Sequence, residues 1–136
     1  MIAFFGAAEV VSIDEVAAMA MALEEVTEGV RYGNRSWMVN GKTFVWERPF
    51  TKADIKRFGD APVPDGPILG VSVEDQMEKQ ALLESNTKAF FNIEHLDGYN
   101  AYLIQLNKAT KKQVREALLD AWLVCAPSRL TEKYLK

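Results

Sequence analysis

An Asn-Gly pair in the first third of the chain constrains the fold more than any other feature. Asn40-Gly41 separates two runs that are rich in aromatic and β-branched residues. Both central positions of a type I′ turn need a positive φ, and Asn-Gly adopts that conformation readily. The sequence therefore predicts an antiparallel hairpin over Tyr32 to Arg48.

This turn also predicts the register of the hairpin, because a slip of one residue would move every side chain to the opposite face. The expected cross-strand pairs are Trp37 with Phe44, Arg35 with Trp46, Met38 with Thr43, and Ser36 with Val45. The first two pairs share one face. We expect that aromatic face to lie toward the core, with Arg35 and Trp46 near its solvent end.

Two capping boxes predict the starts of helices, Ser12 with Glu15 and Thr110 with Gln113. The first helix should run from about Ile13 to Glu25. The second should bury a stripe made of Val114, Leu118, Ala121, Trp122 and Cys125. The other expected elements are a short helix from Thr51 to Phe58, a strand at Ile68 to Val73, a helix at Met77 to Leu83, strands at Ala89 to Ile93 and Tyr99 to Leu106 around an Asp97-Gly98 turn, a helical turn within Arg129 to Leu135, and an N-terminal strand or docked tail within Met1 to Val11.

These elements predict one α+β domain spanning residues 1–136. Strands joined as hairpins and flanked by helices indicate a two-layer antiparallel sheet with helices packed on one face. Strict alternation of strands and helices is missing, which argues against a doubly wound parallel sheet. The only Pro/Gly-rich break, Gly59 to Pro67, is too short for a domain linker.

Cysteine content and hydropathy indicate a cytoplasmic protein. The chain has one cysteine, Cys125, so an internal disulfide is impossible and a reducing compartment fits best. The apolar start is too short to span a membrane and lacks the basic region of a signal peptide. We therefore expect no membrane partner.

Known catalytic patterns are absent from the sequence. His95 is the only histidine, and no G-x-S-x-G elbow accompanies it. One histidine and one cysteine are too few for a typical zinc site. The glycines follow neither phosphate-loop nor dinucleotide spacing. We expect no enzyme activity, cofactor or metal; the alternative is a small-molecule enzyme at the His95 loop.

Basic residues are concentrated in two segments, although the net charge is −3. Residues 29–57 carry seven bases against two acids, and residues 101–136 carry seven against three. Aromatic residues interleave with the first segment, a mixture that can bind nucleic-acid backbones and stack bases. The candidate nucleic-acid-binding residues are Arg31, Arg35, Lys42, Trp46, Arg48, Lys111, Lys112 and Arg115. The alternative is that the aromatic residues fill the core and the charges solubilise strand edges.

Several stretches in order resemble the MmcQ/YjbR family. They are RYGNRSWMVNGKTFVWERP from Arg31, Pro67 to Val73, EKQALL from Glu78, AFF from Ala89, HLDGY from His95 and DAWLVCAPSRL from Asp120. The similarity covers roughly Val30 to Leu130. Glu94 and Asn100 depart from it, because relatives often carry proline at both positions.

The resemblance implies a two-layer α+β fold similar to that of secretion chaperones, and no known enzyme activity. Family members are often labelled DNA-binding on the strength of a double-wing-like arrangement, an analogy from fold. We therefore expect a non-catalytic binding module of uncharacterised role, with DNA as one candidate ligand. The alternative is a protein-interaction or chaperone-like module, often a homodimer.

Overall fold

The computed structural model of the protein describes residues 11–135. The strand expected within Met1 to Val11 therefore lies, apart from Val11, outside the described residues. The sheet contains β1 (Thr27–Arg31), β2 (Asn34–Val39), β3 (Lys42–Glu47), β4 (Ile68–Ser72), β5 (Phe90–Phe91) and β6 (Ala101–Gln105). These strands form one antiparallel sheet in the order β1-β2-β3-β4-β6-β5, which confirms the predicted α+β class.

Three of the five helices in the described residues begin where the capping residues predict. The five are α2 (Ile13–Met21), α3 (Lys52–Phe58), α4 (Gln76–Ser85), α5 (Lys111–Cys125) and α6 (Ser128–Leu135). Capping boxes at Ser12, Thr51 and Thr110 begin α2, α3 and α5. The first helix ends at Met21 rather than Glu25. The chain then turns through residues 22–25, where Glu25 has a left-handed φ of 59°, and Val26 returns to the core. Within residues 11–135, no helix has the length and hydropathy that crossing a membrane requires.

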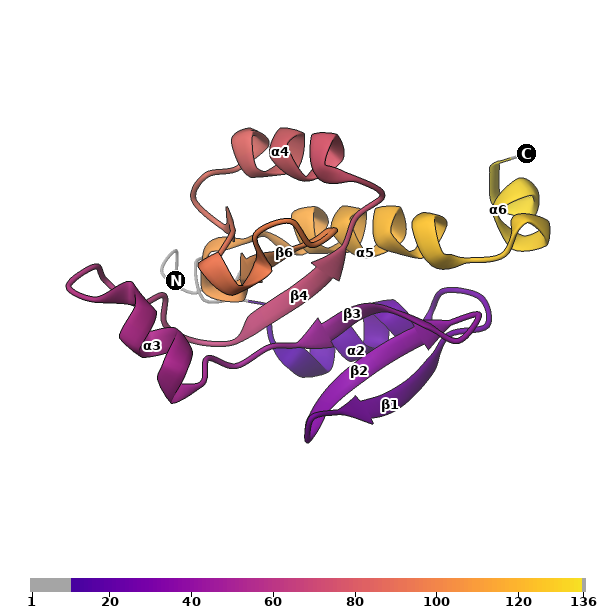
Figure 1. The fold of residues 1–136 in the computed structure, drawn as a ribbon. Coiled ribbons are helices and arrows are strands. Elements are labelled where there is room, and N and C mark those ends of the chain that lie inside the picture. Colours follow the sequence, from indigo (N-terminus) through magenta and orange to yellow (C-terminus); the bar gives the residue numbers. More distant parts are fainter. Residues whose placement is uncertain (1–10, 136) are drawn as a thin grey trace, which may run out of the picture.

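The main core lies between α2, α5 and one face of the sheet (Figure 1). Trp37 and Phe44 are fully buried there, and the α5 stripe from Val114 to Cys125 is buried as predicted. α4 lies alongside α5 in Figure 1 and contacts β5 and β6.

The opposite face of the sheet carries a second, smaller cluster. Ile68 and Leu103 pack there with Ile93 and Leu96, and the rings of Phe50, Phe58 and Phe91 surround them. Side chains alternate along β4, so Ile68 belongs to this cluster while Leu69 belongs to the main core. The chain around α3 and the 3₁₀ turn Glu94–Leu96 thus covers one end of this face.

The predicted hairpin register is wrong for most of its length. Asn40 and Gly41 have positive φ and Met38 faces Thr43, as expected. A β-bulge then shifts the register, so that Trp37 faces Val45 and Ser36 faces Trp46. The shift lets Phe44 and Val45 both enter the core fully buried.

The first strand, β1, was not predicted from the sequence. Its residues have no apolar alternation and are mostly exposed. A second tight turn joins β1 to β2, and Tyr32 and Gly33 have φ of 52° and 79°. Tyrosine rarely occupies this region, so Tyr32 itself gives no indication of a turn.

Candidate functional site

A groove of about 500 Å³ lies on the sheet face opposite α2 and α5. It is bounded by the β1–β2 turn, the end of β3 with the segment after it, and the loop that contains the 3₁₀ turn Glu94–Leu96. Its lining residues are Arg31, Tyr32, Asn34, Trp46, Glu47, Arg48, Pro49, Thr51, His95, Leu96, Tyr99 and Ala101. We call this hollow the aromatic groove.

Three aromatic side chains line the groove. Tyr32 is 91% exposed at the tip of the β1–β2 turn, and Tyr99 is 59% exposed on the facing loop. Trp46 is partly buried and lies over Gly70 of the neighbouring strand. Exposed aromatic rings beside a hollow suit a ligand with planar groups.

Gly70 is the residue that lets Trp46 lie flat on the sheet, since a Cβ at this position would overlap the indole ring. We expect Gly70→Ala to displace Trp46 and to lower the free energy of unfolding by about 1–3 kcal/mol. Trp37 and Trp122 are buried, so the displaced Trp46 should dominate a red shift of the fluorescence emission. An unchanged spectrum would show that the indole does not rest on Gly70.

Arg31 is a cation of the groove whose charge no acid of the described residues neutralises. Its guanidinium carbon lies 5.2 Å from the Trp46 ring centroid and 5.8 Å from that of Tyr32. Within residues 11–135, no carboxylate forms an ion pair with it. The two rings orient this charge and leave its N–H groups available to an anion.

Arg48, by contrast, is already paired. Its Nη1 lies 2.8 Å from Asp54 Oδ2 and donates to the Pro49 carbonyl at 2.8 Å. Burial alone would raise the pKa of Asp54, but hydrogen bonds from Arg48 and the Thr51 backbone outweigh it and lower this pKa to about 2. Arg48 therefore lines the groove, but Asp54 neutralises its charge.

The loop that carries His95 and Tyr99 is attached to α4. Lys79 is 4% exposed, and its Nζ donates to the carbonyls of Leu96 at 2.8 Å and Tyr99 at 3.2 Å. Gln76 donates to the Tyr99 carbonyl at 2.8 Å. Burial lowers the pKa of Lys79, and the nearby Asp97 opposes that shift. These hydrogen bonds fix the wall of the groove that faces Tyr32.

The predicted basic residues do not form one positive face. Arg35 pairs with Asp14 and Glu28, each at 2.8 Å, and Lys111 pairs with Glu15 at 2.8 Å. Arg31, Trp46 and Arg48 line the groove. Lys42, Lys112 and Arg115 lie elsewhere, at the β2–β3 turn and on α5.

His95 lines the groove with an exposed side chain. The nearby acid Asp97 accepts a hydrogen bond from Asn92 Nδ2 at 2.7 Å. Within the described residues, His95 has no side-chain hydrogen bond to an acid or a hydroxyl group. The groove therefore presents the imidazole as a polar contact for a ligand.

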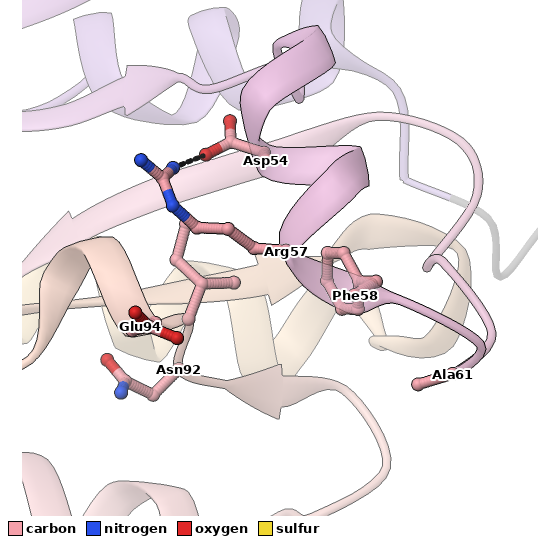
Figure 2. A pocket seen from close by; sticks show the side chains of 7 residues that line it. Asp54, Arg57, Phe58, Ala61, Asn92 and Glu94 are labelled. Carbon is pink, nitrogen blue, oxygen red and sulfur yellow. Dashed lines mark hydrogen bonds and ion pairs between the residues drawn. The ribbon is translucent and has the colours of Figure 1, made fainter.

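A smaller cavity of about 250 Å³ lies beside α3 (Figure 2). Phe58 and Ile93 form its apolar part, and Arg57 pairs with Asp54 of the same helix at 3.4 Å. Asn92 Oδ1 is buried here and has no hydrogen-bond partner among the described residues. An unsatisfied acceptor of this kind would accept a hydrogen bond from an N–H group or a water molecule.

Sequence reasoning missed Asn34 and Tyr99 as nucleic-acid-binding residues, whereas Tyr32 is among the aromatic residues of the first basic segment that were expected to stack bases. Tyr32 was expected at the start of a strand, and its exposure follows from the unpredicted β1–β2 turn. The Gly33 that follows it was the available signal for a turn at this point. Tyr99 was assigned to a strand that in fact begins at Ala101.

Comparison with known proteins gives relatives and a shared fold. The chain is 34% identical over 125 residues to "Uncharacterized protein Rv2570" of Mycobacterium tuberculosis and to "Uncharacterized protein Mb2600" of Mycobacterium bovis, covering 90% of this chain and 94% of each relative. No family model matches the sequence. The crystal structure of Deinococcus radiodurans protein DR2400, described as a DUF419 domain, superposes with a TM-score of 0.63 at 10% identity, covering 91% of this chain and 88% of that one.

Proposed function

We propose a non-catalytic binding function for this chain, which belongs to the family of the mycobacterial proteins Rv2570 and Mb2600. We place that family within the MmcQ/YjbR group. The ordered sequence stretches from Arg31 to Leu130 support this placement, as does the likeness of the fold to a DUF419 domain. Its members' DNA-binding label makes nucleic acid the first ligand to consider.

The ligand that best fits the groove is single-stranded nucleic acid. The observation that carries the proposal is the Arg31 guanidinium in cation–π distance of both Trp46 and Tyr32, with Tyr99 also lining the groove. Stacking on exposed rings binds unpaired bases, while an arginine neutralises a phosphate. A duplex hides its base faces and needs a broad positive surface, whereas Arg35, Arg48 and Lys111 are paired with acids.

The test is a fluorescence-anisotropy titration of labelled oligothymidylate, about 12 nucleotides long, at low salt. We expect micromolar affinity, weaker binding of the matching duplex, and a shallow salt dependence set by few phosphate contacts. No saturation at tens of micromolar protein would reject the proposal. Stronger binding of the duplex would reject the groove as the binding surface.

Tyr32 gives a second test, because its backbone is strained. A tyrosine at φ 52° costs about 1 kcal/mol or more, and asparagine tolerates this region better. We expect Tyr32→Asn to raise the free energy of unfolding by about 0.5–1 kcal/mol while it weakens oligonucleotide binding about tenfold. Denaturant unfolding and anisotropy measure the two effects. A variant that gains stability and keeps its affinity would show that Tyr32 is not a ligand contact.

A second candidate function is protein interaction through β1. This strand ends the sheet, and its outer edge pairs with no strand of the described residues. Val30 on it is 76% exposed. An open edge can accept an extended segment of a partner or of a second copy. Sedimentation of the chain would support this alternative if a dimer forms and Val30→Lys dissociates it.

A further inference from the structure

The volume of the aromatic groove is that of a pocket for one small ligand. It is about 500 Å³, and pockets that enclose a small molecule span about 300–1,000 Å³. Domains that follow a single strand along an open channel instead occupy about 4–16 nucleotides. The groove can therefore hold only a short piece of a strand, and its lining residues indicate how short.

Two aromatic rings of the groove are free to stack on a base. Tyr32 is 91% exposed and Tyr99 is 59% exposed. The ring of Trp46 is already engaged by the protein, because Gly70 lies against the indole and the Arg31 guanidinium lies over it at 5.2 Å. Since one exposed ring stacks on one base, the groove offers stacking surfaces for two bases.

One arginine of the groove is free to bind a phosphate. The lining contains two arginines and no lysine, and Asp54 already pairs with Arg48 at 2.8 Å. Arg31 forms no ion pair with the acids of the described chain. Glu47 also lines the groove, and its negative charge disfavours a second phosphate nearby. The groove is therefore suited to a single phosphate.

The fold fixes the positions of these groups. Arg31 and Tyr32 are consecutive in the chain, so the phosphate contact lies beside the first stacking ring. The second ring belongs to a loop that α4 holds in place, because Lys79 and Gln76 donate to the Tyr99 carbonyl at 3.2 and 2.8 Å. The groove should therefore select the length of its ligand as well as its chemistry.

We propose that the aromatic groove binds two consecutive unpaired nucleotides and the one phosphate that joins them. One base stacks on Tyr32 and the other on Tyr99, while Arg31 neutralises the phosphodiester between them. The inference rests on the proposed nucleic-acid function and adds the size of the binding unit. This unit occurs in a free dinucleotide and at each step of a longer strand, whose further nucleotides lie outside the groove and add little affinity.

The experiment is a length series in which unlabelled ligands displace labelled oligothymidylate, about 12 nucleotides long, from the full chain. We expect the dinucleotide TpT to bind within about tenfold of the 12-mer, because the longer strand differs only in offering more overlapping pairs. Thymidine 5′-monophosphate lacks the second base and should bind at least about tenfold more weakly than TpT. Tighter binding of TpT than of the 12-mer would support the pair as the unit and assign the groove to free dinucleotides.

The salt dependence of binding counts the phosphates independently. One phosphate contact on a single strand predicts a slope of about −0.7 when the logarithm of the association constant is plotted against that of the salt concentration. Arg31→Gln should flatten this slope and weaken binding of TpT and of the 12-mer about tenfold. The matched control is Arg115→Gln, an exposed arginine of α5 outside the groove, which should keep the affinity within about twofold. Circular dichroism checks that both variants are folded.

The possible results separate this inference from the function on which it rests. Saturable binding of the 12-mer with a salt slope of about −2 or steeper would overturn the two-nucleotide unit and leave the groove as a longer single-strand site. Thymidine 5′-monophosphate binding as tightly as TpT would also overturn it, as would Arg115→Gln weakening TpT as much as Arg31→Gln does. No binding of either the 12-mer or TpT would reject the proposed function itself.

Discussion

Asp54→Asn is expected to lower the free energy of unfolding at neutral pH by about 2–3 kcal/mol. The Asp54 side chain is 2% exposed and accepts from Arg48, Arg57 and the Thr51 backbone. Asparagine keeps the shape but removes the charge that balances the partly buried Arg48. Denaturant unfolding at pH 7 measures the loss, and a change below about 0.5 kcal/mol would contradict the assigned role of this pair.

The stabilisation by Asp54 should disappear at low pH, because its carboxyl group is charged only above its pKa. The pKa of Asp54 falls from 3.8 to about 2 on folding, so its stabilisation is complete above the unfolded value and disappears as the pH falls through the folded value. The stability of wild type and Asp54→Asn should therefore converge between pH 4 and about 2. The control is Asp14→Asn, whose side chain is 92% exposed and whose loss should cost about 0.5 kcal/mol or less.

Removing both exposed tyrosines of the aromatic groove is expected to have the largest effect on binding. Tyr32→Ser together with Tyr99→Ser should weaken oligothymidylate binding about 100-fold, because stacking contributes about 1–3 kcal/mol per base. Both rings are largely exposed, so the fold should tolerate their loss. Anisotropy titrations of the folded double variant measure the change.

The matched control removes charge from the other predicted basic segment. Lys112→Ala with Arg115→Ala eliminates two cations of α5 that lie outside the aromatic groove. Their affinity should stay within about threefold of the wild type at moderate salt. If this pair weakens binding more than the tyrosine pair does, the ligand binds on α5 rather than in the groove.

The elements that the sequence predicted well are those coded by local signals. The Asn40-Gly41 turn and the capping boxes depend on residues within four positions of one another, and the structure confirms them. The bulge at Phe44 depends on what the main core can accommodate, so local pattern could not reveal it. The β1 strand was missed because the rest of the sheet, not its own apolar pattern, supports it.

The candidate site was predicted only in part, because charge density along a chain does not show pairing in space. Arg35 is neutralised by Asp14, 21 residues away, and Lys111 by Glu15 from the other end of the chain. Arg31 and Trp46 were named from their local mixture of charge and aromaticity, and the structure brings them together. The facing wall of the groove comes from a loop that only the tertiary contacts of Lys79 and Gln76 place there.

The central claim is that the aromatic groove is the binding surface of this protein. Amide and indole chemical shifts recorded during an oligothymidylate titration test it most directly. The account predicts that the Trp46 indole N–H and the amides of Tyr32 and of residues 94–100 shift together and saturate. Shifts confined to α4 and α5, with the Trp46 resonance unmoved, would contradict it.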